Sequence, residues 1–70
     1  MLAWNERLMV IRAMQKYGGS FVQQLGKTLQ CADEENAELL INLFRYKYPD
    51  YFPEGDKYKA AKSSYDWETA

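Results

Sequence analysis

The side chains that most often carry out chemistry in proteins are scarce in this chain. Its 70 residues contain no histidine and a single cysteine, Cys31. A Ser-His or Cys-His nucleophile is therefore excluded, and so is a disulfide within these residues. A zinc site is disfavoured because no imidazole or second thiol could complete it. We interpret Cys31 as a small packed apolar residue whose free thiol is typical of a reducing compartment.

Acidic side chains gather only once, at Asp33, Glu34, Glu35 and Glu38. None has an apolar setting in the sequence that would tune its pKa for acid–base work. We interpret the cluster as the start of a helix, because an N-cap aspartate and early glutamates stabilise the positive end of the helix dipole. The alternative is an acidic patch that fills a basic groove as a DNA mimic does, which a net charge of -1 disfavours.

No enzyme signature remains among the other residues. The run Gly18-Gly19-Ser20 lacks the lysine and the preceding strand of a phosphate-binding loop. We therefore predict no catalytic residue, no cofactor and no metal. Nucleic acid is disfavoured as a partner, because the chain has nine basic and ten acidic residues. A helix-turn-helix formed by the second and third helices would also present carboxylates to the DNA.

The chain also lacks the signals of membrane or secreted proteins. No stretch approaches the roughly 18 apolar residues of a membrane span. The start, from Met1 to Arg7, has no basic region followed by an apolar one. We expect a cytoplasmic protein without a membrane partner.

Three segments with helical periodicity are expected to position the functional surface. The first runs from Leu2 to Tyr17. Its apolar stripe consists of Trp4, Leu8 and Ile11, a neighbouring row of Met9, Ala13 and Tyr17, and Val10 and Met14, which widen it. Gly18-Gly19 should end this helix with a left-handed cap. The second begins at Ser20, which forms a predicted capping box with Gln23. Its apolar face is made of Phe21, Val22, Leu25 and Leu29.

Two further features shape the second and third patterns. Gly26 lies inside the second helix, where it should allow another helix to approach closely. The third helix begins after Asp33 and ends before Pro49. It carries one apolar row of Ala37, Leu40, Ile41 and Phe44, and a second row of Leu39, Leu43 and Tyr46.

Two apolar rows exceed what one helix of a bundle needs. Either the third helix is central and touched by both other helices, or part of its surface meets another chain. A chain this short has little core to spare, which favours a homodimer or a monomer stabilised by its partner. We predict Leu39, Leu43 and Tyr46 as the dimer face.

After the third helix the sequence becomes rich in aromatic residues and turns. We expect the segment from Tyr48 to Phe52 to fold back over the helices, and a short helix after Asp56 is an option, with Tyr58, Ala61 and Tyr65 on one side. The fold class is therefore all-α, a compact three-helix bundle with an aromatic and proline-rich C-terminal segment. Residues 1–53 form the bundle, and residues 54–70 form a polar tail or short helix.

The aromatic residues of the last segment stand among polar neighbours. Tyrosine and tryptophan offer large contact areas at low entropic cost and are enriched where proteins recognise one another. We predict Tyr58, Tyr65 and Trp67 as partner-binding residues, with Tyr51 as a lesser candidate. The alternative is a C-terminal helix packed on the bundle.

Part of the chain resembles a known group of proteins. The run from Gly18 to Val22, then Ala32-Asp33, Asn36 and Phe44, is similar to a pattern in short proteins encoded in phages and prophages. The resemblance spans about residues 8–53, and the spacing from Phe44 to the aromatic-proline ending is extended here. It implies a protein that binds a host protein, as an inhibitor of a defence system such as CRISPR. The alternatives are a small DNA-associated transcriptional regulator, dimeric through the third helix, and a minor virion assembly component.

Overall fold

Helices make up nearly all of the structure, a computed structural model that describes the backbone of residues 2–69 and the side chains of residues 2–63. The elements in order are α1 (Trp4–Tyr17), α2 (Ser20–Cys31), α3 (Glu34–Lys47), the short 3-10 helix η1 (Pro49–Tyr51) and α4 (Asp56–Thr69). No strand occurs in the part of the chain that is described. The expected all-α fold is confirmed, and so is the fourth helix.

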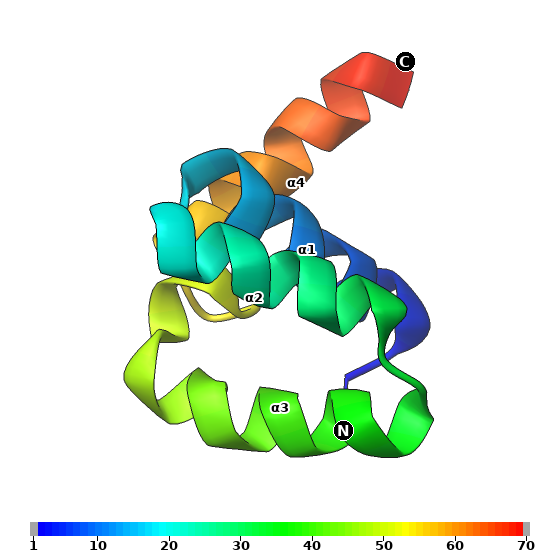
Figure 1. Cartoon of the computed structure of the whole chain (residues 1–70). Coiled ribbons are helices and arrows are strands. Elements are labelled where there is room, and N and C mark those ends of the chain that lie inside the picture. The colour runs from blue at the N-terminus through cyan, green and yellow to red at the C-terminus, as the bar shows by residue number, and fades with distance from the viewer. Residues whose placement is uncertain (1, 70) are drawn as a thin grey trace.

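Helix α1 is the central element. It packs closely against α2, α4 and η1, whereas the backbone of α3 comes close only to α2 and η1. Contact between α1 and α3 is made by long side chains, as in the ion pair of Arg7 with Glu34. In Figure 1, α3 accordingly lies at one edge of the molecule and α4 at the opposite edge, with α1 and α2 between them. The interpretation of α3 as the central helix is therefore wrong.

The ends of α3 follow the sequence closely. The carboxylate of Asp33 accepts a hydrogen bond of 2.8 Å from the backbone N–H of Asn36, which confirms the predicted N-cap. The helix ends at Lys47, two residues before Pro49, because the residue that precedes a proline avoids helical geometry.

The corner between α1 and α2 is built differently from the prediction. Gly19 is the N-cap of α2 and no side chain caps this end. Gln23 instead donates to the carbonyl of Gly18 at 3.0 Å, so the predicted capping box is wrong. Gly18 has a φ of -82° and is not left-handed. It is needed for space, because a Cβ there would lie 2.6 Å from Cγ1 of Val22.

The core is centred on the second half of α1. Its buried side chains come from every helix: Val10, Ile11, Ala13, Met14, Val22, Leu25, Leu29, Ala37, Ile41, Tyr51, Phe52, Tyr58 and Ala61. The stripe predicted for the first helix is only partly right, because Trp4 and Leu8 are exposed. Ile11, Ala13, Val10 and Met14 of the predicted stripe are buried, because α1 is covered by both α2 and α4.

Close contact between α1 and α2 depends on Gly26, as expected. A Cβ at this position would lie 3.2 Å from Cβ of Met14 and 3.2 Å from Cγ of Gln15. Any larger side chain would therefore push the two helices apart.

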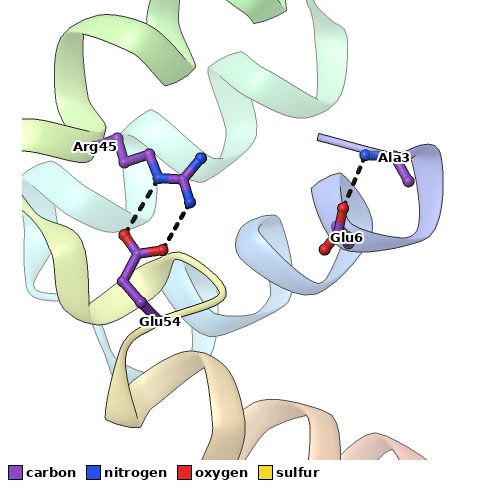
Figure 2. Close-up of polar contacts among 4 residues, drawn as sticks. All are labelled: Ala3, Glu6, Arg45 and Glu54. Carbon is purple, nitrogen blue, oxygen red and sulfur yellow. Dashed lines mark hydrogen bonds and ion pairs between the residues drawn. The ribbon is translucent and has the colours of Figure 1, made fainter. Parts of the chain in front are cut away.

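The segment after α3 folds back over the helices, as predicted. Tyr51 and Phe52 are buried in the core. Arg45 at the end of α3 holds the following loop through two hydrogen bonds to Glu54, of 3.2 and 2.7 Å, as Figure 2 shows. The same figure shows Glu6 accepting from the backbone N–H of Ala3 at the start of α1, at 3.0 Å.

Helix α4 is anchored by its first turns. Tyr58 and Ala61 are buried against the other elements, so the expected apolar side of this helix is confirmed as far as its side chains are described. The later turns extend beyond the remaining helices in Figure 1. None of the helices described is both long and apolar enough to cross a bilayer.

Candidate protein-contact surface

Two of the four predicted partner-binding residues belong to the core. Tyr51 and Tyr58 are buried. Packing within the chain therefore explains why these two residues are aromatic, and no partner is needed to explain it. Burial raises the pKa of the Tyr58 hydroxyl, and the charge of Glu6 raises it further. Tyr65 and Trp67 lie in the extended end of α4, and their side chains are outside the described part of the structure.

The second apolar row of α3 points away from the core. Leu39, Leu43 and Tyr46 are 62%, 66% and 93% exposed, whereas Ala37 and Ile41 of the first row are buried. The cause is the position of α3 at the edge of the fold, where η1 and α2 cover only one of its sides. The predicted dimer face is therefore open surface on this chain.

An open groove adjoins this row. It lies between the second half of α2 and the first half of α3 and has a volume of about 690 Å³. Its lining is mostly apolar and consists of Lys27, Thr28, Cys31, Ala32, Asn36, Leu39 and Leu40. Cys31 is exposed here, so its interpretation as a packed apolar residue is wrong. The groove depends on how α2 and α3 lie relative to each other on the two sides of the turn that joins them, which residue types alone do not indicate.

Two other exposed apolar side chains, Trp4 and Phe21, have ring contacts within the chain. The guanidinium of Arg7 lies 4.5 Å from the ring centre of Trp4, a favourable cation–π distance. Phe21 contacts Phe44 and Tyr48 with ring centres 6.0 and 6.2 Å apart. No such contact engages Tyr46 among the residues whose side chains are described.

Charge is distributed unevenly along α3. Its first turn holds Glu34 and Glu35, and its last turn holds Arg45 and Lys47. Glu34 is used within the chain, since it forms an ion pair of 3.1 Å with Arg7. In the part of the chain with described side chains, no ion pair involves Glu35 or Lys47.

The Arg45–Glu54 pair neutralises one basic group of α3 within the chain. The hydrogen bond from Arg45 holds the pKa of Glu54 below its ordinary value, and the pKa of Arg45 is raised by the same bond. The other basic group of this end is Lys47, whose ammonium lies 5.9 Å from the ring centre of Tyr48.

The acidic cluster forms no site for a cation in the described residues, where no three acidic or thiol groups come together. Asp33 caps α3 and Glu34 pairs with Arg7, which agrees with the interpretation of the cluster as a helix start. What the surface of α3 offers chemically is apolar area with charge at its two ends. This is suited to protein contact.

Comparison with known proteins adds no relative. No family model, no curated protein and no solved structure matches the chain. The surface geometry and the sequence pattern are therefore the basis for a functional proposal.

Proposed function

We propose that this chain is a non-enzymatic binding protein that acts through contacts with other proteins. The observation that carries the proposal is the outer face of α3, where Leu39, Leu43 and Tyr46 are exposed beside an open groove. Exposed apolar surface of this kind is costly for a monomer and marks interaction sites. A few residues, with tyrosine, tryptophan and arginine foremost, supply most of the affinity of a protein contact, and buried leucine side chains add apolar area to it.

The phage-type pattern supports a finer proposal. In that setting the foreign partner is a host protein, and the chain inhibits a bacterial defence system by occupying it. The end of α4 supplies the foreign contact, through Tyr65 and Trp67. It lies at the opposite edge of the fold from α3, so both surfaces can be occupied together.

The proposal is tested by capture from a bacterial host with the tagged chain. The informative variants are Tyr65→Ala with Trp67→Ala, and a chain truncated after Ser63. This truncation keeps Tyr58 and Ala61, which are part of the core, and removes the last turns of α4. We expect one host complex with the full chain and its loss with both variants.

Two controls make the result decisive. Far-UV circular dichroism must show that the variants keep their helices, and Tyr46→Ala must keep the host complex if α4 is the foreign contact. If the complex survives the truncation, α4 does not carry the contact. If neither the α4 variants nor Leu43→Glu changes what is captured, the chain does not act through these surfaces.

A further inference from the structure

We infer that the outer face of α3 binds a second copy of this chain in an antiparallel arrangement. The inference rests on the proposed function, because it names the partner of a surface already proposed for protein contact. It follows from the spacing, the polarity and the charge of the residues on that face.

The spacing is that of a helix that pairs with another helix. Asn36, Leu39, Leu43 and Tyr46 follow one another at intervals of three, four and three residues. This is the repeat that places one side chain per turn along a helix–helix contact. All four side chains are exposed, so the row is free along its whole length.

In an antiparallel pair, the leucines of the row meet leucines and its polar groups meet polar groups. With a two-fold axis near residue 41, Leu39 of one copy meets Leu43 of the other, and Asn36 meets Tyr46. The leucines then form an apolar centre, and the amide and hydroxyl groups lie together at each end. In a parallel pair, Asn36 would face its own counterpart, and so would Tyr46.

The charges favour the same direction. At the first turn of α3, Glu35 carries a negative charge that no ion pair among the described side chains uses, and the last turn is basic through Lys47. An antiparallel pair brings Glu35 of each copy beside Lys47 of the other, whereas a parallel pair places like charges together. The two helix dipoles are also opposed only in the antiparallel pair.

The groove gives the exposed tyrosine a place to bind. Asn36 lines the groove, so a Tyr46 ring that lies beside Asn36 of the second copy also lies over that copy's groove. Thr28 and Lys27 on its wall offer hydrogen-bonding groups for the phenol hydroxyl. The arrangement is reciprocal, as an isologous two-fold contact requires.

Cross-linking of single cysteines tests the arrangement. In a chain with Cys31→Ser, we compare Asn42→Cys with Glu34→Cys, two exposed positions of the same helix. The two Asn42→Cys thiols lie close to the two-fold axis, whereas the Glu34→Cys thiols lie about 21 Å apart along the helices at 1.5 Å per residue. We expect a short bismaleimide to join two chains through the first cysteine and not through the second. Equal cross-linking at both positions would overturn the antiparallel arrangement.

Sedimentation of Leu43→Glu tests the face itself. We expect the unmodified chain to be a dimer and this variant to bind its second copy at least 100-fold more weakly. Leu8→Glu, on the exposed side of α1, is the matched control and should stay dimeric. A monomeric unmodified chain, or a dimer that resists Leu43→Glu, overturns the inference.

Failure of the dimer inference can be told apart from failure of the proposed function. If the unmodified chain is monomeric but Leu43→Glu abolishes capture of a host protein, the second copy is excluded and the surface still binds protein. If the chain is monomeric and Leu43→Glu leaves capture unchanged, α3 is not a contact surface for either partner.

Discussion

The account of the fold predicts very different costs for removing two aromatic rings that are six residues apart. Phe52 is 0% exposed and Tyr46 is 93% exposed. Replacing a buried phenylalanine by alanine costs about 3–5 kcal/mol, because the ring leaves a cavity. A chain of this length has a stability of about 4–10 kcal/mol, at 0.05–0.15 kcal/mol per residue. Phe52→Ala should therefore remove much of the stability, whereas Tyr46→Ala should change it by less than about 0.5 kcal/mol.

Urea unfolding followed by circular dichroism measures both costs. Both substitutions are made in a chain that carries Leu43→Glu, so that any contribution from a second copy is absent. We expect the midpoint of the Phe52→Ala transition to fall sharply, or the variant to be unfolded in buffer. Equal midpoints for the two variants would refute the placement of η1 and Phe52 over the core.

Three further predictions follow from local geometry. Gly26→Leu should destabilise the chain by about 2 kcal/mol in urea unfolding, because overpacking separates α1 from α2. The lowered pKa of Glu54 stabilises the folded chain above the ordinary glutamate value of 4.5, and this contribution is lost as the pH falls through the lowered pKa. It amounts to at most about 1 kcal/mol, because both partners are well exposed to solvent; Glu54→Gln should remove that part of the pH dependence of stability. Leu43→Ala should raise the dimer Kd by at least about 100-fold in sedimentation equilibrium. It removes three carbon groups per copy, worth about 2.4 kcal/mol at 0.8 kcal/mol per CH₂. Because the side chain is 66% exposed in the single chain, about two-thirds of this burial is lost with the dimer, or about 3 kcal/mol over two copies.

Local signals in the sequence predicted the elements well. Asp33 and Pro49 set the bounds of α3 because an N-cap and a proline act on the backbone beside them. The buried positions of α2, Val22, Leu25 and Leu29, follow from helical periodicity. The need for a glycine at position 26 also follows from its place on an apolar face.

The features that the sequence did not predict depend on which helices are neighbours. Periodicity shows that a helix has an apolar side, and it does not show how many helices cover that side. Tyr58 has polar neighbours in sequence but lies under α1 in the fold, so it was predicted as surface. The groove was missed because it depends on the relative placement of α2 and α3.

The second row of α3 was the ambiguous signal. The pattern of Leu39, Leu43 and Tyr46 was compatible with a central helix or with an interface, and the position of α3 at the edge removes the first of these explanations. The phage-type setting belongs to the proposed function alone, whereas the structure shows that the second row of α3 is exposed beside a groove.

The central claim is that the outer face of α3 is a protein-contact surface occupied by a second copy. A dilution series of amide NMR spectra of the unmodified chain tests it most directly, because each residue reports its own surroundings. We predict concentration-dependent shifts for Asn36, Leu39, Leu43 and Tyr46, and for residues that line the groove, with none at Trp4 or Leu8. Spectra that do not change with concentration, and that retain the line widths of an 8.2 kDa monomer, would contradict the claim, as would shifts confined to α1.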